Sequence, residues 1–180
     1  MEMKRNLIIE SNIRRTVRQV ISEMMGRGFT VHFMLGLPGS GKSTFIQNNL
    51  AGIPVISRDN IRIEMGLCGE GEKAVGTREE ENQITEIEYD KIRNCCENQE
   101  DFVIDDTNLN RKYRKMMIDF IRSFPGAHIV VHHLNTPLEV CIDRRKDDIP
   151  SDVMRRIFDR MSVPDENEYD ELDTINYDDM

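Results

Sequence analysis

Apolar and polar positions form two kinds of pattern along most of this chain. Short apolar runs rich in β-branched residues predict buried strands at 30–35, 53–57, 102–105, 127–134 and, more weakly, 172–175. The segments between them have helical spacing and predict helices over about 42–50, 59–65, 78–98, 110–124, 136–146 and 150–162. Strands that alternate with helices indicate an α/β fold, with a mostly parallel sheet of about four or five strands and helices on both faces.

A separate amphipathic segment precedes this alternation. Ser11 is a suitable N-cap, and the apolar residues that follow recur at helical spacing: Ile13, Val17, Val20, Ile21 and Met24. We therefore expect an N-terminal amphipathic helix within 1–28, a main domain over 29–176 and a short tail at 177–180. The polar positions of this helix are basic, and it could pack on the domain, mediate self-association or contact nucleic acid.

Length and charge narrow the class of protein. A chain of 180 residues fits one domain. Its net charge of −9 is concentrated at 164–180, which hold eight acids and no Lys or Arg; the remainder has 24 bases and 25 acids, hence about −1. This balance excludes a general nucleic-acid coat but not a local basic patch for a strand end.

No apolar run approaches the ~20 residues that span a membrane, so we expect a cytoplasmic protein without membrane contact. The sequence does not indicate the oligomeric state.

The cysteines and histidines do not have the spacing of a metal site. Four cysteines, including the adjacent pair Cys95 and Cys96, lack ligand spacing, and reduced thiols are the default in the cytosol. His132 and His133 are neighbours on a predicted strand, where alternation sends them to opposite faces. We expect these residues to have structural roles.

A glycine-rich loop follows the first predicted strand directly. The loop and the start of the next helix read Gly36, Leu37, Pro38, Gly39, Ser40, Gly41, Lys42, Ser43 and Thr44. Glycines allow backbone N–H groups to converge on phosphates, and the following helix N-terminus adds positive partial charge. Lys42 is predicted to bridge the β- and γ-phosphates, and the Ser43 hydroxyl is the expected Mg²⁺ ligand. This pattern predicts binding of a nucleoside triphosphate, ATP or GTP.

Charged residues follow the second predicted strand, where they would share one crevice with the glycine loop. A kinase needs a group that accepts the proton of the acceptor hydroxyl, and cations that hold the transferred phosphoryl group. Asp59 is a candidate general base, and Arg62, one helical turn later, could hold an acceptor phosphate or orient Asp59. The alternative is an Asp that caps a helix beside a surface Arg.

The third predicted strand ends in Asp105, Asp106, Thr107 and Asn108. An acid at this strand end could hold the water shell of Mg²⁺ or an active-site Arg, and Thr107 and Asn108 could contact the acceptor. Turn formation is the alternative, since Asp and Asn favour turns.

These motifs together resemble the 5′-kinase domain of bacteriophage polynucleotide kinase. The resemblance covers about residues 30–163 in the same order: Gly-x-Pro-Gly-Ser-Gly-Lys-Ser-Thr, Arg-Asp-x-x-Arg, Asp-Thr-Asn-Leu-Asn at 106–110, and Ile-Pro-Ser-Asp-Val-Met-Arg-Arg-Ile. It implies the P-loop kinase fold and transfer of the ATP γ-phosphate to the 5′-hydroxyl of DNA or RNA. It also implies Lys42 and Ser43 as phosphate-binding residues, Asp59 as general base, Arg62 as the acceptor-phosphate contact and Asp106 as an essential acid.

The chain departs from this family in two places. The family has a lid with an arginine that contacts the donor; the corresponding segment here, within 136–150, is shorter, and Arg144 and Arg145 are both candidates. The phage enzyme continues into a 3′-phosphatase domain, for which this sequence has no room. We therefore expect a kinase only, with a possible functional partnership with a separate phosphatase or ligase.

The sequence thus favours an ATP- and Mg²⁺-dependent polynucleotide 5′-hydroxyl kinase. The alternative is a P-loop kinase for a small hydroxyl acceptor, such as a nucleoside, a sugar or an antibiotic. A non-catalytic nucleotide-dependent interaction module is a third possibility, against which Asp59 argues.

Overall fold

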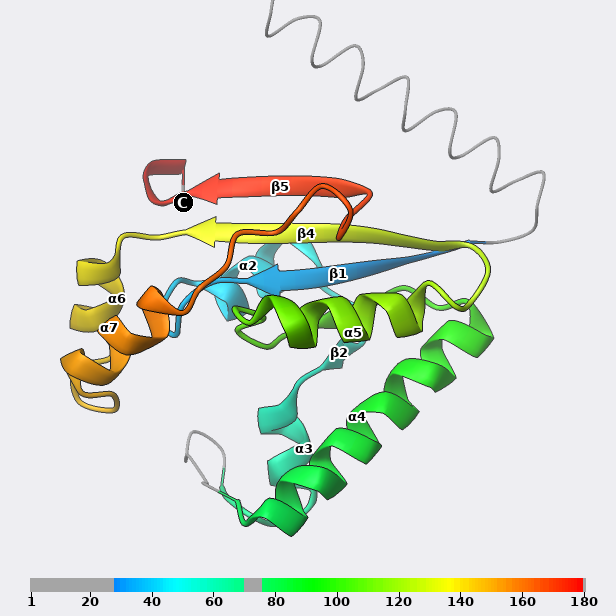
Figure 1. Cartoon of the computed structure of the whole chain (residues 1–180), viewed down its shortest axis with the longest axis horizontal. Coiled ribbons are helices and arrows are strands. Elements are labelled where there is room, and N and C mark those ends of the chain that lie inside the picture. The colour runs from blue at the N-terminus through cyan, green and yellow to red at the C-terminus, as the bar shows by residue number, and fades with distance from the viewer. Residues whose placement is uncertain (1–27, 70–75, 180) are drawn as a thin grey trace, which may run out of the picture.

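The structure is a computed structural model, and it describes residues 28–69 and 76–179. The predicted N-terminal helix lies outside the described residues, except for Gly28. Five strands form one sheet in the order β2-β3-β1-β4-β5, and every neighbouring pair is parallel. Their bounds are Phe29–Leu35 (β1), Val55–Ile56 (β2), Phe102–Ile104 (β3), Ala127–Asn135 (β4) and Glu171–Asn176 (β5). The predicted parallel α/β sheet is confirmed (Figure 1).

The helices occupy both faces of the sheet. They are Lys42–Asn49 (α2), Arg58–Glu64 (α3), Arg78–Asn98 (α4), Arg111–Ile121 (α5), Leu138–Arg144 (α6) and Ser151–Asp159 (α7), and the 3₁₀ turn Tyr177–Asp179 (η1) follows β5. Alternation along β1 sends Met34 into a core cluster with Ile46 of α2. Phe33 enters the larger cluster on the other face, which includes Ile92 of α4 and Ile118 of α5. The strands are therefore apolar on both faces, as expected for a sheet covered twice.

Capping residues in the sequence determine where the two longest helices, α4 and α5, begin. Thr77 and Glu80 form a capping box at the start of α4: Glu80 N–H donates to Thr77 Oγ1 at 3.3 Å, and Thr77 N–H donates to Glu80 Oε2 at 2.6 Å. The Asn110 side chain caps α5 by accepting from Lys112 N–H at 2.9 Å. Both predicted helix starts are confirmed.

Three predicted elements are shorter than expected. The strand expected at 53–57 is only Val55–Ile56, because Ile53 N–H closes a turn onto Leu50 C=O at 3.2 Å. The helices expected over 136–146 and 150–162 shrink to α6 and α7, and the chain after α7 bonds back through Ser162 N–H to Leu109 C=O at 3.0 Å. Tertiary contacts override local propensity at these ends.

The acidic C-terminal region is ordered, as expected for part of 164–176. β5 pairs with β4 from Val130↔Glu171 to Asn135↔Asn176. The segment before β5 is anchored by Glu168, which is 3% exposed and pairs with the buried Arg114 of α5 at 2.5 Å. No helix in the described part of the chain has the length and apolarity needed to cross a membrane.

Candidate active site

The glycine loop lies between β1 and α2, at the carboxyl end of the sheet. Gly39 (φ 83°) and Gly41 (φ 101°) have left-handed backbone conformations that side chains disfavour. A Cβ at Gly39 would lie 2.8 Å from Arg145 Cγ, so this position also lacks room for a side chain. The loop closes with Ser40 N–H donating to Leu37 C=O at 3.1 Å. This is the backbone geometry that lets N–H groups converge on phosphate.

Lys42 is held at the centre of the loop. Its Nζ donates to the carbonyl oxygens of Gly36 at 3.0 Å and of Leu37 at 3.1 Å. Burial lowers the pKa of Lys42, and the nearby carboxylates of Asp105 and Asp106 oppose that shift. The Lys42 ammonium is thus desolvated, and nearby acids partly balance its charge. A desolvated ammonium at this position can bind a phosphate.

The donor set around the loop fits Mg²⁺. Ser43 and Thr44 are exposed in the first turn of α2. Burial raises the pKa of Asp105, and the neighbouring Lys42 lowers it, so a second cation nearby would stabilise this carboxylate. In the described residues no three His, Cys, Asp or Glu side chains form a metal cluster. Mg²⁺ commonly takes one or two protein oxygens and fills its shell with phosphate and water.

Both arginines of the predicted lid contact the glycine loop. Arg144 Nη1 donates to Gly39 C=O at 3.0 Å, and its guanidinium lies 5.4 Å from the centre of the Tyr177 ring. Arg145 also lies against Gly39, and its charge helps to lower the pKa of Lys42. Arg145 is therefore the arginine whose charge acts on Lys42, whereas Arg144 is engaged with Tyr177.

Asp59 and Arg62 form an ion pair on α3, with Arg62 Nη1 2.8 Å from Asp59 Oδ1. The Asp59 side chain is 90% exposed and that of Arg62 only 15%, because Arg62 also donates to both carboxylate oxygens of Glu81 at 2.9 and 3.1 Å. The helix cap is Ser57, whose Oγ accepts from Asp59 N–H at 3.2 Å. The alternative of Asp59 as the capping residue is thus wrong, and its carboxylate is available to a substrate.

Asp105 and Asp106 have different surroundings. Asp105 is close enough to Lys42 and Asp59 for their charges to shift its pKa. Asp106 Oδ1 accepts from Arg58 N–H at 3.4 Å, and burial together with the adjacent Glu88 raises the pKa of Asp106. Asp105 therefore borders the phosphate loop, while Asp106 borders α4. The role of Asp106 as a metal ligand stays a prediction.

The residues after Asp106 connect the end of β3 to the glycine loop. Gly36 N–H donates to Thr107 C=O at 3.3 Å, while the Thr107 side chain is exposed. Asn108 has φ 50°, and its amide donates to Met34 C=O at 2.9 Å. Buried Arg114 donates to Asn108 C=O at 2.6 Å. Asn108 is thus held as part of the framework, and Thr107 is the freer of the two predicted acceptor contacts.

Sequence reasoning missed the residues of α4 that support this site. Glu81, Thr85 and Glu88 recur one helical turn apart and receive the guanidinium of Arg58 at 2.8, 3.0 and 2.9 Å. Glu88 is 2% exposed. The spacing of these acids was the available signal, but a highly charged helix gives no sign of which acid is buried.

His132 and His133 point to opposite faces of the sheet, as predicted. His132 faces α2, where its ring packs at a tilt against Phe45 and its Nε2 lies 2.9 Å from His32 Nδ1. His133 faces the opposite side, where the charge of Arg114 helps burial to lower its pKa. Cys95, Cys96 and Cys141 are buried free thiols.

The parallel sheet, the left-handed glycines around Lys42 and the strand-end acids define a P-loop nucleotide-binding domain of the kinase type. The chain belongs to the AAA domain family AAA_33, whose family model matches residues 31–163.

One curated relative belongs to Autographa californica nuclear polyhedrosis virus and is named "Putative bifunctional polynucleotide kinase/RNA ligase". It is 28% identical over 130 residues, which are 65% of this chain and 18% of that protein. The chain thus spans less than a fifth of that relative's length.

Solved structures share the fold. A chain of the Pnkp1/Rnl/Hen1 RNA repair complex matches with a TM-score of 0.64 and 20% identity, over 75% of this chain and 45% of that one. A sugar kinase from Janibacter sp. matches with a TM-score of 0.53 and 17% identity, over 83% of this chain and 84% of that one. Identities this low show the fold and leave the acceptor open.

Proposed function

We propose that this protein is an ATP-dependent polynucleotide 5′-hydroxyl kinase. The observation that carries the proposal is the Asp59–Arg62 pair: an exposed carboxylate beside a mostly buried guanidinium, on the helix that follows β2. A 5′-terminal nucleotide offers a hydroxyl for the carboxylate and a 3′-phosphate for the guanidinium. The order of motifs shared with the phage kinase and the name of the baculovirus relative support the same acceptor.

The proposed reaction is a phosphoryl transfer from ATP to this hydroxyl. The 5′-hydroxyl oxygen attacks the γ-phosphorus of ATP, the bond from that phosphorus to the β-phosphate oxygen breaks, and ADP leaves. Asp59 accepts the hydroxyl proton. Lys42 and Arg145 stabilise the negative charge of the transferred group. Ser43, with Asp105 or Asp106, would hold Mg²⁺, which would supply positive charge to neutralise the phosphates.

The same site would also serve a small hydroxyl acceptor, and the two readings predict different products. The protein is incubated with γ-labelled ATP and Mg²⁺ and offered 5′-hydroxyl oligonucleotides of DNA and RNA beside nucleosides and sugars. Label on the oligonucleotide 5′ end supports the proposal. Label on small acceptors alone would replace it with the small-molecule kinase.

Asp59→Asn tests the role of the carboxylate. Loss of a general base costs ~10²–10⁴-fold in rate. Asp90→Asn is a matched control, because Asp90 also pairs with an arginine three residues later and is 70% exposed. We expect Asp59→Asn to lose turnover with nucleotide affinity retained and Asp90→Asn to keep both. Equal rates in the two variants would remove Asp59 from the mechanism.

We further propose that the product, a 5′-phosphate end, is used by a separate ligase, with a phosphatase preparing the opposite strand end. The baculovirus relative carries the names of a kinase and a ligase together, which supports this pairing of reactions.

A further inference from the structure

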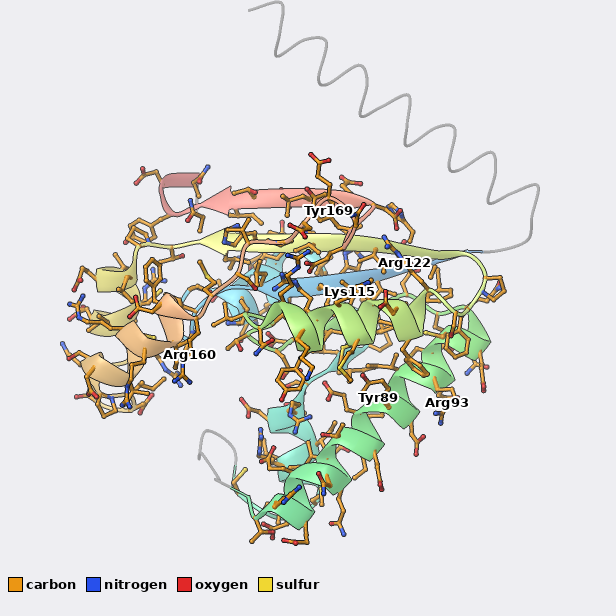
Figure 2. All side chains as sticks on the ribbon, in the orientation of Figure 1. Tyr89, Arg93, Lys115, Arg122, Arg160 and Tyr169 are labelled. Carbon is orange, nitrogen blue, oxygen red and sulfur yellow. The ribbon has the colours of Figure 1, made fainter. Side chains whose placement is uncertain are left out.

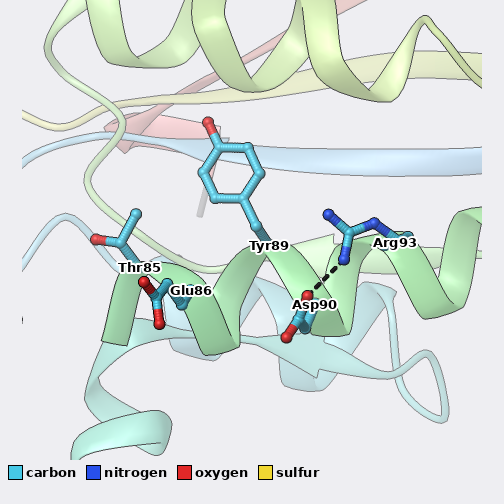
Figure 3. Close-up of a pocket in the computed structure, with 5 residues that line it drawn as sticks. All are labelled: Thr85, Glu86, Tyr89, Asp90 and Arg93. Carbon is cyan, nitrogen blue, oxygen red and sulfur yellow. Dashed lines mark hydrogen bonds and ion pairs between the residues drawn. The ribbon is translucent and has the colours of Figure 1, made fainter. Parts of the chain in front are cut away.

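A hollow of about 440 Å³ lies along α4 on the side that faces α5. Its lining residues are Thr85, Glu86, Tyr89, Asp90 and Arg93. Tyr89 rises from α4 toward α5 (Figure 3) and meets Phe120 edge-on, with ring centroids 5.0 Å apart. Arg93 lies over the same Phe120 ring at 5.8 Å. We call the hollow and the side of α5 that faces it the α4–α5 groove.

The α5 wall of this groove exposes large apolar side chains. Tyr113 is 68% exposed and Met116 is 51% exposed, and both lie on the same side of α5 as Phe120 by helical spacing. Tyr89 lies between α4 and α5 (Figure 2), where its ring meets that of Phe120, while Tyr113 and Met116 remain exposed. An aromatic floor with exposed apolar walls fits an amphipathic helix better than it fits a small polar ligand.

The α4 side of the groove is acidic, whereas α5 carries four bases and one acid. α4 contains seven acids and three bases, a net charge of −4, and Glu86 and Asp90 form its exposed lip. The acidic α4 lip favours a basic segment over a polynucleotide, whose phosphates would meet Glu86 and Asp90 there. Residues 1–27 of the same chain contain six bases and three acids, a net charge of +3. They also carry the apolar helical stripe from Ile13 to Met24.

The point where the chain enters the sheet places this segment at one end of the groove. Phe29 N–H donates to Gly126 C=O, five residues beyond α5, at 3.2 Å. Thr30 N–H donates to Asp101 Oδ1, three residues beyond α4, at 2.6 Å. The chain that precedes β1 therefore arrives between the C-terminal ends of the two helices that form the groove.

The length of the segment matches the groove. At ~1.5 Å per residue, 27 helical residues span about 40 Å, whereas the 21 residues of α4 span about 32 Å. A helix that starts back along α4 from Gly28 can reach the hollow around Tyr89 with residues to spare.

We propose that the N-terminal segment binds the α4–α5 groove as an amphipathic helix. The stripe Ile13, Val17, Val20, Ile21 and Met24 packs on Tyr89, Met116 and Phe120. The bases Arg14, Arg15 and Arg18, which flank the stripe, meet the acidic lip. This docking covers the exposed apolar face and links the N-terminal segment to the helix that supports Arg58 and Arg62.

The full chain lacks tryptophan, so one introduced indole reports on the docking. Val17→Trp places it in the apolar stripe, and Gln19→Trp places it on the opposite side of the same helix as a matched control. We expect blue-shifted emission and protection from acrylamide for the first indole, and solvent-like values for the second. Both properties of the first should be independent of protein concentration.

Groove variants then test the location. Met116→Glu and Asp90→Lys alter exposed positions, so the fold should persist, which far-UV circular dichroism checks. Each should expose the indole at position 17. Phe158→Glu, at an aromatic residue of α7 that is 41% exposed, should leave it protected.

Three results would overturn the proposal. An indole at position 17 that is already exposed in the full chain means that the segment lies elsewhere. Protection that survives both groove variants assigns the segment to another surface. Protection that appears only as protein concentration rises assigns the groove to a second copy of the chain.

Discussion

The buried pair of Arg114 and Glu168 allows a quantitative prediction. Arg114 is 1% exposed and Glu168 is 3% exposed, and Arg114 Nε lies 2.5 Å from Glu168 Oε2. Glu168→Ala leaves a buried guanidinium without its counter-charge, which costs ~3–5 kcal/mol. With a urea m-value of about 2 kcal/mol/M, a loss of ~4 kcal/mol lowers the unfolding midpoint by about 2 M.

Urea unfolding followed by circular dichroism measures this loss. The double variant Arg114→Met with Glu168→Leu removes both charges, and replacing a buried pair by apolar residues is often neutral or stabilising. It should therefore recover most of the lost stability. Glu171→Ala, a carboxylate that is 61% exposed, should change stability by under ~0.5 kcal/mol. A loss below about 1 kcal/mol for Glu168→Ala, the range of exposed pairs, would refute the reasoning.

Three further predictions concern other parts of the molecule. Lys42→Met should weaken nucleotide binding roughly ten- to hundredfold in calorimetric titration, because a charge-assisted hydrogen bond contributes ~1.5–3 kcal/mol; unchanged affinity would contradict its role. Thr77→Ala should cost ~1 kcal/mol in urea unfolding, since it removes half of the capping box. Burial beside His132 lowers the pKa of His32 from 6.5 to about 4. Between pH 6.5 and about pH 4, His32 is therefore protonated in the unfolded chain but neutral in the folded protein. Stability should therefore fall with acidification across this window, less steeply in His32→Gln; identical slopes would exclude His32 as a source.

Periodicity and capping signals were enough to predict most of the fold. The spacing at 78–98 and the cap at Asn110 gave the starts of α4 and α5, and the apolar runs gave the sheet. The shortened elements could not be predicted, because Ile53 and Ser162 make backbone bonds to other segments and no local pattern encodes those contacts.

The place of the glycine loop could be predicted because the motif directly follows a predicted strand, whereas the role of Asp59 stays a prediction. The different surroundings of Asp105 and Asp106 could not be predicted, because two adjacent acids are equivalent in sequence. In the structure the charge of Lys42 acts on Asp105, and Glu88 lies next to Asp106. Arg144 and Arg145 were equivalent in sequence for the same reason; the cation–π contact of Arg144 with Tyr177 and the effect of the Arg145 charge on the pKa of Lys42 distinguish them.

The backbone bond from Gly36 N–H to Thr107 C=O has a thermodynamic consequence. It connects the glycine loop to the loop proposed to bind the acceptor. We therefore expect a ligand that fixes the conformation of one loop to restrict the conformation of the other. Coupling between two binding sites is reciprocal, and each ligand must then change the affinity of its partner by the same factor. Because both groups belong to the main chain, the bond does not require a particular side chain at position 107, whereas position 36 needs glycine, since a Cβ there would lie 2.6 Å from Ser40 Oγ.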